Sequence, residues 1–460
     1  MYKNLYFIGI GGIGMSALAR YFNKRGVQVC GYDKTQTPLT QALEDEGIRI
    51  HYDDDPAQIP ADTELVIRTP AVPPDLKIFQ DIQKKNIPVV KRSEILGRIT
   101  AGTRNIAVAG THGKTTTSIL IAHLLYDAGV ELTAFLGGIA TNYQSNFLDR
   151  GDAWMVEEAD EYDRSFLQLH PTHAVIGSLD ADHLDIYGSP EAMVENYLAF
   201  AGQIKSGGML LLSDSLSGDQ IKRFRTNCPN LRIHTFGLDS PDIKVAITGT
   251  DSGWTSFSYI KENINMKNLA LRMPGQHNIR NAAAAIAIAM EAGVSEDGIR
   301  SGLQSFKGIQ RRFEWIRETR DQVLIDDYAH HPEELRAAIS ACRSMYPGRH
   351  LTGIFQPHLY SRTRDFMDAF AEVLALLDRV ILVEIYPARE AAIPGISSET
   401  LFERIAHQDK ILTSQSALCG VLRRLELDVV MTLGAGDLDQ MQDQISAAIF
   451  DRHVKTEVKA

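Results

Sequence analysis

The chain has 460 residues, of which 44% are hydrophobic and 23% charged, and its formal net charge is −11 at pH 7. This length and composition indicate an ordinary globular protein of about two to four domains. The negative charge argues against a general nucleic-acid-binding protein, although a site for a small anion can be built locally.

No apolar run approaches the roughly 18 residues that span a membrane, and the N-terminus leads directly into a predicted strand. We therefore expect no membrane insertion, no signal peptide and a cytoplasmic location. The four cysteines are far apart and lack metal-binding spacing, so we predict reduced thiols. They are Cys30, Cys228, Cys342 and Cys419.

The N-terminal segment carries a glycine-rich motif between two predicted strands, Leu5–Ile8 and Val27–Gly31. The motif is Gly9-Ile-Gly-Gly-Ile-Gly14, and Asp33 follows it by about 20 residues, as in nucleotide-binding βαβ units. The glycines let the backbone approach a pyrophosphate, and Asp33 can accept a hydrogen bond from a ribose hydroxyl. By itself the motif indicates NAD or FAD, but UDP offers the same pyrophosphate and ribose.

A second nucleotide-binding motif begins after the predicted strand Asn105–Ala109 and leads into a predicted helix, Ser118–Asp127. A strand, a glycine-rich turn and a helix form a phosphate cradle, because backbone N–H groups and the helix dipole favour an anion. Lys114 would contact the outer phosphates, and the Thr115 hydroxyl can ligate Mg²⁺. The residues predicted to bind ATP here are Gly110, Thr111, His112, Gly113, Lys114, Thr115 and Thr116.

This loop is a shortened phosphate-binding loop, since Val108 stands where the general pattern has a glycine. A glycine turn with a surface lysine is the alternative interpretation.

Two acidic clusters follow the predicted strands Trp154–Val156 and Ala174–Ile176. The first cluster includes Glu158, and the second includes His183. Because Mg²⁺ prefers oxygen ligands, we interpret the clusters as metal sites, with solvated loop ends as the alternative.

Beyond a predicted hairpin, Ile243–Ile260, polar residues precede an alanine-rich helix, Ala282–Met290. His277, Asn278 and Asn281 would bind a base or ribose, or else cap the helix. Arg312 would stabilise charge on a transferred phosphoryl group, or else pair with Glu314.

The C-terminal third alternates strands and helices, which predicts a parallel, doubly wound sheet. Four polar segments fall at strand ends, where such sheets bind ligands. They are 326–332, 356–363, 386–390 and 434–437.

We predict an α/β protein of three domains: a Rossmann-like domain at residues 1–103, a P-loop ATPase-like domain with a mixed sheet at 104–318, and a doubly wound Rossmann-like domain at 319–460.

These motifs resemble the Mur ligase family, the ATP-dependent amide-forming enzymes of peptidoglycan synthesis. The motifs that carry the resemblance are Gly110–Thr116, Glu158–Glu161, Asp182-His183, Gly275–Asn281 and Asp327–Pro332. Within the family the chain is most similar to the ligases that join L-alanine to UDP-N-acetylmuramate. That likeness rests on Gly9–Ser16, Phe355–His358 with Ser361–Thr363, and Tyr386–Ala388 with Ile393–Gly395.

The resemblance implies ATP, Mg²⁺, UDP-N-acetylmuramate and L-alanine as ligands, and it implies a role for each matching residue. Lys114, Arg312 and His330 would be catalytic. Thr115, Glu158 and His183 would hold metal, and His277, Asn278, Asn281, Arg312 and Asp327 would lie near ATP. Gly11, Gly14 and Asp33 would hold the UDP end, and Tyr328, His330 and Arg362 would meet the amino acid.

Three positions depart from the family pattern. Leu359 stands where Arg is frequent, Ser178 where Asn is usual, and Thr69-Pro70-Ala71 where Ser-Ser-Ala is common. Glu161-Tyr162-Asp163 also resembles the recycling ligase that attaches a preformed tripeptide to the same sugar nucleotide. That ligase generally lacks a segment like Phe355–His358, so we keep its activity as the alternative.

The implied reaction is attack of the lactyl carboxylate on the γ-phosphate of ATP, followed by attack of the amine of L-alanine on the acyl phosphate. An α-amino group has a pKa around 7.7–8.0, so it must lose a proton before it attacks. His330 would orient the amine or take that proton, unless His330 or His331 is a buried structural histidine. Two other classes remain open: an NAD-dependent dehydrogenase and a non-catalytic nucleotide-binding regulator. The sequence carries no signal for oligomeric state.

Overall fold

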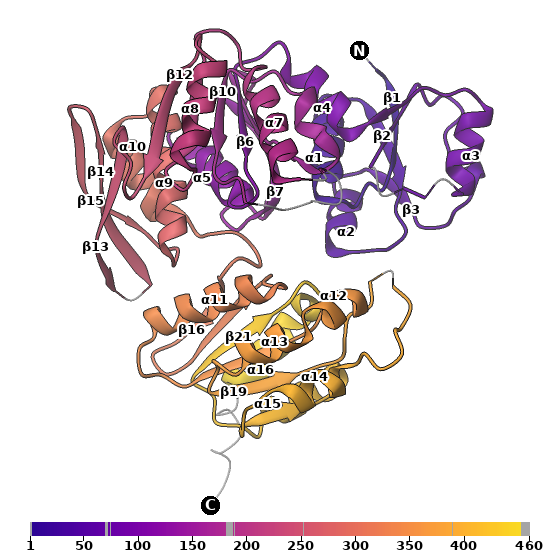
Figure 1. Cartoon of the computed structure of the whole chain (residues 1–460). Coiled ribbons are helices and arrows are strands. Elements are labelled where there is room, and N and C mark those ends of the chain that lie inside the picture. The colour runs from indigo at the N-terminus through magenta and orange to yellow at the C-terminus, as the bar shows by residue number, and fades with distance from the viewer. Residues whose placement is uncertain are drawn as a thin grey trace, which may run out of the picture. The chain divides into compact units, whose positions relative to one another are not determined.

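The computed structural model of the chain describes residues 2–69, 72–73, 75–180, 187, 189–251, 253–388 and 390–451 (Figure 1). The chain forms two compact units. The first comprises Met1–Gly249, Ser256–Leu271 and Gln276–Lys307, and the second comprises Thr250–Thr255, Arg272–Gly275 and Gly308–Ala460. Among the described residues, no helix combines the length and apolar character that crossing a membrane requires.

The first sheet of the chain is a five-stranded parallel sheet in the order β3-β2-β1-β4-β5. Its strands are β1 (Asn4–Ile8), β2 (Gln28–Tyr32), β3 (Arg49–His51), β4 (Leu65–Arg68) and β5 (Val89–Lys91). Its helices are α1 (Ile13–Lys24), α2 (Pro38–Asp45), η1 (Pro56–Gln58), α3 (Lys77–Lys84) and α4 (Arg92–Thr100). The strand order reverses between β1 and β4, and in such sheets ligands bind beyond the strand ends at this switch point. The glycine-rich loop leaves β1 at that place.

The central sheet has ten strands in the order β15-β14-β13-β12-β11-β10-β6-β9-β7-β8. Its strands are β6 (Asn105–Ala109), β7 (Leu132–Ala140), β8 (Ser145–Asp149), β9 (Trp154–Glu158), β10 (His173–Ile176), β11 (Met209–Ser213), β12 (Arg232–Gly237), β13 (Ile243–Asp251), β14 (Trp254–Lys261) and β15 (Ile264–Leu271). The pairing is mixed, because β7 pairs with β8 antiparallel and with β9 parallel. The predicted hairpin is present as β13 and β14, and β15 extends it.

The helices of this region are α5 (Lys114–Asp127), η2 (Tyr162–Gln168), α7 (Pro190–Ala201), α8 (Gly218–Asn227), α9 (Gln276–Glu291) and α10 (Glu296–Ser305). In Figure 1, α7 and α8 lie on one face of the sheet, and α5, α9 and α10 on the other. Every residue of α5 from Thr115 to Leu125 is buried, as expected for a helix that is apolar on all sides. The alanines of α9 are also buried, and their small side chains let α9 pack closely against α5.

The third sheet has six strands in the order β16-β17-β21-β18-β19-β20. They are β16 (Glu314–Glu318), β17 (Val323–Asp327), β18 (Leu351–Phe355), β19 (Arg379–Leu382), β20 (Lys410–Leu412) and β21 (Val429–Leu433). The sheet is parallel except for β16, which pairs antiparallel with β17. The sequence did not predict β16.

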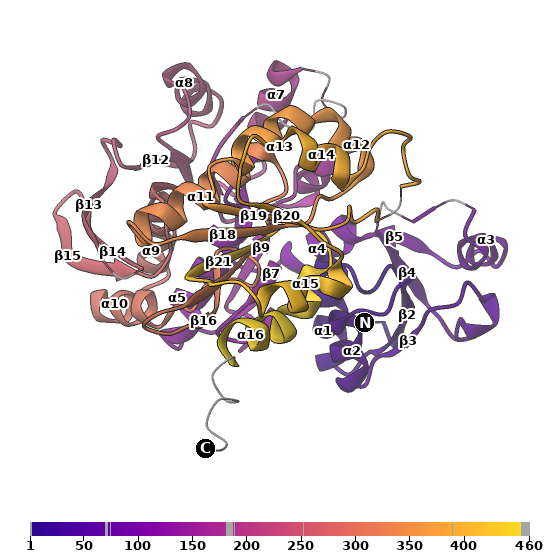
Figure 2. The ribbon, with the colours of Figure 1, turned by 90° about the horizontal axis from the view of Figure 1, so that it is seen from below.

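The helices of the third sheet are α11 (Pro332–Met345), α12 (Tyr360–Asp365), α13 (Met367–Leu374), α14 (Ser398–Arg404), α15 (Gln415–Leu422), η3 (Leu438–Met441) and α16 (Gln442–Phe450). Figure 2 shows α11, α13 and α14 on one face and α15 and α16 on the other. Each face has its own apolar core, since Val323 and Ile325 contact one set of helices and Leu324 the other. The predicted α/β class, with two Rossmann-like sheets and a mixed central sheet, is confirmed.

Candidate functional site

The loop Gly110–Thr116 joins β6, near the middle of the central sheet, to the N-terminus of α5. Gly110 and Gly113 have φ values of +128° and +82°, which side-chain-bearing residues rarely adopt. A Cβ on Gly110 would lie 2.9 Å from the backbone nitrogens of Gly177 and Ser178, so glycine is also required by space. Helix α5 begins at Lys114 rather than at the predicted Ser118. Lys114, Thr115 and Thr116 therefore form its first turn, where backbone N–H groups are free to bind an anion.

The side chains of Lys114 and Thr115 both contact acidic residues. Lys114 Nζ donates to the carbonyl of Gly110 at 2.7 Å and forms a 2.7 Å ion pair with the buried carboxylate of Glu161. Thr115 Oγ1 donates to Glu158 Oε1 at 3.0 Å. Hydroxyl and carboxylate oxygens together are suitable ligands for Mg²⁺, which needs few protein groups beside a phosphate.

Gly137 on β7 makes room for the Glu158 carboxylate. A Cβ at this position would lie 1.7 Å from Glu158 Oε2, so any larger residue would displace it. No group of three or more His, Cys, Asp or Glu side chains placed to bind a metal occurs within the described ranges. His183 lies outside the described residues. The cradle and the Thr115–Glu158 pair nevertheless fit a triphosphate with one Mg²⁺.

Ser178, which follows β10, holds the phosphate loop in place. Its hydroxyl lies 2.8 Å from Thr111 Oγ1 and accepts a hydrogen bond from the backbone N–H of His112 at 2.9 Å. Although Ser178 stands where the family usually has Asn, it therefore keeps a polar contact to the phosphate loop. The His112 ring lies 3.8 Å from Asp180 Oδ2, with both side chains largely exposed.

The polar residues predicted to precede the alanine-rich helix lie inside α9, which begins at Gln276. Asn281 faces the phosphate loop, because a Cβ on Gly113 would lie 3.0 Å from Asn281 Oδ1. Asn281 also donates to Asn278 Oδ1 at 3.4 Å, and His277 is exposed at the helix start. The structure thus brings Asn281 to the phosphate loop through the packing of α9 on α5.

In the N-terminal sheet, Asp33 stabilises the glycine-rich loop directly. Its two carboxylate oxygens accept hydrogen bonds from the backbone N–H of Gly11 at 2.7 Å and of Thr35 at 3.2 Å. A Cβ on Gly14 would lie 3.0 Å from a terminal nitrogen of Arg92, so the guanidinium covers this part of the loop. Arg92 in turn pairs with Asp160 at 3.3 Å.

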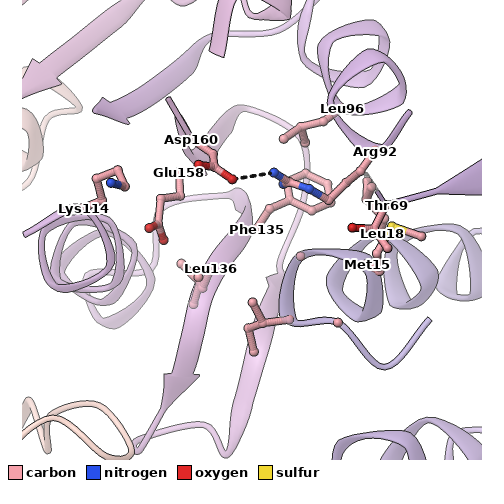
Figure 3. Close-up of a pocket in the computed structure, with 14 residues that line it drawn as sticks. Met15, Leu18, Thr69, Arg92, Leu96, Lys114, Phe135, Leu136, Glu158 and Asp160 are labelled. Atoms are coloured by element: carbon pink, nitrogen blue, oxygen red, sulfur yellow. Dashed lines mark hydrogen bonds and ion pairs between the residues drawn. The ribbon is translucent and has the colours of Figure 1, made fainter. Parts of the chain in front are cut away.

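A cavity of about 330 Å³ connects the glycine-rich loop to the phosphate loop (Figure 3). Its lining residues come from α1, α4 and loops of the N-terminal region and from α5, β7, β9 and the residues after β9 in the central region. They are Gly12, Ile13, Gly14, Met15, Leu18, Thr69, Arg92, Leu96, Lys114, Phe135, Leu136, Gly137, Glu158 and Asp160. Figure 3 shows Lys114 and Glu158 on one side and Met15, Leu18 and Thr69 on the other, with the Arg92–Asp160 pair between them. The size is that of a small-molecule site, with apolar walls and a few convergent charges.

In the second unit, Asp327 anchors two loop segments at the end of β17. Its carboxylate accepts hydrogen bonds at 2.8 Å from the backbone N–H groups of Phe313 and Ala329. Burial raises the pKa of Asp327 to about 6. The backbone N–H of the exposed Arg312 donates to the carbonyl of Ile309 at 3.2 Å, while its guanidinium makes no hydrogen bond or ion pair with any described residue. The alternative pairing of Arg312 with Glu314 is not observed, because Glu314 accepts from the backbone N–H of Arg311 at 2.9 Å.

His330 and His331 are adjacent but have different surroundings. His330 Nδ1 lies 2.9 Å from the carbonyl of Tyr328 and 3.3 Å from Glu334 Oε2. Both partners are acceptors, so Nδ1 carries the proton and Nε2 keeps a lone pair when the ring is neutral. Burial lowers the pKa of His330, which favours that neutral form. His331 instead caps α11 and packs against Phe366.

His358 is a candidate residue that the sequence reasoning did not select individually. Its ring stacks on Tyr386 at 5.8 Å between centroids and lies 6.2 Å from the ring of His330. Burial lowers its pKa to about 4, and the neighbouring Arg362 and His330 add to the effect. The sequence analysis identified the segment 356–363 as a polar strand end. His358 is the one histidine in that segment, and this could have marked it as a candidate.

Arg362 lies on α12 and makes no side-chain hydrogen bond or ion pair within the part of the chain that the structure describes. Leu359 immediately precedes α12, with a φ of +69°.

The sequence matches three family models. The Mur ligase family catalytic domain matches residues 4–104, the Mur ligase middle domain residues 108–289, and the Mur ligase glutamate ligase domain residues 311–436.

Among curated relatives, the UDP-N-acetylmuramate–L-alanine ligase of Christiangramia forsetii is 44% identical over 97% of this chain and 98% of its own. The ligase of the same name from Porphyromonas gingivalis is 46% identical over 95% and 97%. Among solved structures, the UDP-N-acetylmuramate-alanine ligase of Thermotoga maritima matches with a TM-score of 0.81 and 25% identity, over 96% of this chain and 98% of that one. A murein peptide ligase from Psychrobacter arcticus shares the fold over 100% of both chains, with a TM-score of 0.70 and 22% identity.

Proposed function

The chain belongs to the Mur ligase family, and on that premise we propose that it joins L-alanine to the lactyl carboxylate of UDP-N-acetylmuramate, with conversion of ATP to ADP and phosphate. The relatives that carry this activity in their names match nearly the whole chain. The observation that supports the proposal most directly is the cavity lined by the glycine-rich loop at one end and by Lys114 and Glu158 at the other. A ligand long enough to fill it would place its far end at the phosphate loop.

We assign residues 1–103 to the sugar nucleotide, 104–318 to ATP and 319–460 to the amino acid. Gly11 and Gly14 bring backbone close to the UDP pyrophosphate, and Asp33 holds the loop that does so. His277, Asn278 and Asn281 lie on the ATP side, with Asn281 against the phosphate loop. Because ATP and UDP-N-acetylmuramate are nucleotides made inside the cell, we propose that the enzyme acts in the cytoplasm, in the synthesis of peptidoglycan precursors.

The first chemical step brings a carboxylate to a triphosphate, so the site must offset repulsion between like charges. Two unit charges at 4 Å repel by about 4 kcal/mol at an effective dielectric of 20. Lys114 supplies a fixed positive charge, the first turn of α5 supplies N–H donors, and Arg312 supplies a guanidinium that makes no hydrogen bond or ion pair with a described residue. Mg²⁺ held by Thr115 and Glu158, with His183 as a further ligand, would neutralise phosphate charge.

The second step needs a neutral amine, although most α-amino groups are protonated at pH 7. Nε2 of His330 is an unprotonated base because Nδ1 donates to the Tyr328 carbonyl and burial lowers the pKa of the ring. His330 therefore takes the proton, while Arg362 binds the carboxylate of L-alanine and Tyr328 contacts its side chain.

Phosphate release from ATP tests the proposal. The full chain is expected to release phosphate only when UDP-N-acetylmuramate and L-alanine are both present. Release that ignores the sugar nucleotide would reject the ligase. Replacing L-alanine with the murein tripeptide separates the two ligase activities, and the relatives at 44% and 46% identity favour L-alanine.

A further inference from the structure

A buried polar network joins the glycine-rich loop to the β7–β8 hairpin of the central sheet. Asn146 on β8 is fully buried, and its amide nitrogen donates to the carbonyl of Ile13 at 2.5 Å and to Ser16 Oγ at 2.9 Å. Ser16, also fully buried, donates to the same carbonyl at 2.9 Å. Both contacts lie in the first turn of α1, directly after the glycine-rich loop.

The amide of Asn146 is held in one orientation by Arg20. This guanidinium is 4% exposed, donates to Asn146 Oδ1 and also binds Glu46 through Nε at 2.8 Å. Because the amide oxygen accepts from a cation, the amide nitrogen must face Ile13. Buried polar groups are costly unless each is satisfied, and Asn146 satisfies the Ile13 carbonyl, Ser16 and Arg20 together.

The opposite strand is irregular at the level of Asn146. In the antiparallel pair, Phe135 is opposite Phe147 and Ala140 is opposite Ser145, with a shift of register between them. Asn146 alone therefore lies opposite residues 136–139 of β7. This irregular stretch carries Leu136 and Gly137, which line the cavity.

The irregular stretch also holds the proposed metal ligand, since Gly137 gives the Glu158 carboxylate its space. The β7–β8 hairpin thus contacts the start of α1 on one side and Glu158 on the other. Ile13, whose carbonyl Asn146 binds, lines the same cavity as Lys114 and Glu158. Asn146 is thus a polar link between the two ends of that cavity, in addition to the Arg92–Asp160 pair.

Apolar and ionic contacts hold the hairpin on α1 independently of this link. The ring of Tyr21 lies 5.4 Å from that of Phe135 and 6.4 Å from that of Phe147, and Arg25 pairs with Asp149 at 3.2 Å. These contacts lie further along α1. Asn146, in contrast, contacts the first turn of the helix itself.

We propose that Asn146 is a positioning residue that fixes the glycine-rich loop, and with it the sugar nucleotide, relative to Lys114 and Glu158. This inference rests on the proposed function. Asn146 does not contact the reacting atoms. It acts through the carbonyl of Ile13. Its contribution matters because a small misplacement of a bound substrate strongly lowers the rate of a reaction.

The test is Asn146→Asp in the full chain. Aspartate has the same shape and still accepts from Arg20, but it cannot donate to Ile13 or Ser16 and places an oxygen against the Ile13 carbonyl. We expect the KM for UDP-N-acetylmuramate to rise about 10-fold, while the KM values for ATP and L-alanine stay within about twofold. An unchanged KM for the sugar nucleotide, or an equal rise for all three substrates, would overturn the proposal.

Calorimetric titration of UDP-N-acetylmuramate without ATP separates this inference from the proposed function. Wild-type protein that binds the sugar nucleotide but does not ligate L-alanine contradicts the function, while about 10-fold weaker binding by Asn146→Asp still supports the positioning role. Wild-type protein that does not bind the sugar nucleotide overturns both.

Ser145→Ala is the matched control, because the hydrogen bonds of the Ser145 hydroxyl among the described residues are to the backbone of Phe147 on the same strand. It should leave the binding of the sugar nucleotide unchanged at a comparable melting temperature. If both variants lose binding in proportion to their loss of thermal stability, the role of Asn146 is merely structural and the proposal fails.

Discussion

The phosphate loop of the central sheet and the strand ends of the C-terminal sheet present their functional side chains in different ways. Gly110–Thr116 is continuous in sequence, and its shape depends on two glycines with positive φ and on the start of α5. Tyr328, His358 and Tyr386 come from separate segments that meet because β17, β18 and β19 end at one edge of the sheet.

The two regions also differ in how their charge state is set. Lys114 is cationic by its chemistry and is held by the buried carboxylate of Glu161. His330 and His358 are neutral because burial lowers their pKa values. A short sequence motif is therefore enough to specify a phosphate-binding site. A histidine that accepts a proton from an amine must be neutral, and its surroundings in the folded protein determine whether it is.

We expect the largest effect at the charged residue of the phosphate loop, Lys114. Lys114→Ala removes the fixed cation of the phosphate loop and should lower kcat by about 10³-fold or more, because transition-state charge is left unbalanced. Steady-state phosphate release measures the effect. Lys84→Ala, at an exposed lysine of α3, is the control. Retention of most activity in Lys114→Ala would defeat the assigned phosphate role.

The carboxyl group of Glu157, next to Glu158 in sequence, is another group whose charge state is set by burial. Glu157 is fully buried and bonded to the Asn105 amide at 2.9 Å, and burial raises its pKa to about 8. The folded state thus keeps the proton that the unfolded state releases above its lower pKa, so stability falls as pH rises from about 4.5 to about 8.

Glu157→Gln should remove a pH-dependent loss on the order of 4 kcal/mol across that interval. Urea unfolding at the two ends of the interval measures it. The variant keeps an oxygen for the Asn105 amide, so its stability at the acidic end should match that of the wild type. An equally steep loss of stability in the variant would show that Glu157 is not the titrating group.

The role of the neutral His330 is tested by comparing it with its sequence neighbour His331. His330→Gln should lower kcat by about 10²-fold, because the amine loses its proton acceptor. In the wild type, kcat/KM should fall on the acidic side, below the ordinary histidine pKa of about 6.5, since burial lowers the pKa of His330. That limb should be absent from the residual activity of the variant.

His331→Asn is the control for His330→Gln, because asparagine can replace the cap of α11. It should keep its activity within about twofold of wild type. A loss at His331 as large as that at His330 would mean that both side chains act through the fold.

The smallest expected effect concerns the departure at Leu359. Leu359→Arg should lower the KM for L-alanine about threefold by adding a second cation beside Arg362 for the carboxylate. The KM for ATP serves as the internal control. No change in the KM for L-alanine would indicate that Arg362 alone suffices.

The sequence by itself determined the elements whose geometry is local. The strand β6, the glycines of the phosphate loop and the glycine-rich loop after β1 were all predicted, because turn and helix-start conformations depend on neighbouring residues. The alternation of strands and helices in the last third likewise predicted the doubly wound sheet, though not the antiparallel edge strand β16. A single short edge strand has no periodic pattern that distinguishes it from a loop.

Only the tertiary structure decided which polar side chains are already hydrogen-bonded to other parts of the protein. Asp33 and Asp327 were predicted to face ligands, yet their carboxylates accept hydrogen bonds from the backbone N–H groups of Gly11 and Phe313, which are distant in sequence. Asn146 binds the first turn of α1 from a strand far along the chain, and His330 is distinguished from His331 only by what surrounds it. Burial and long-range hydrogen bonding depend on packing between distant segments, and this is why composition and spacing cannot specify them.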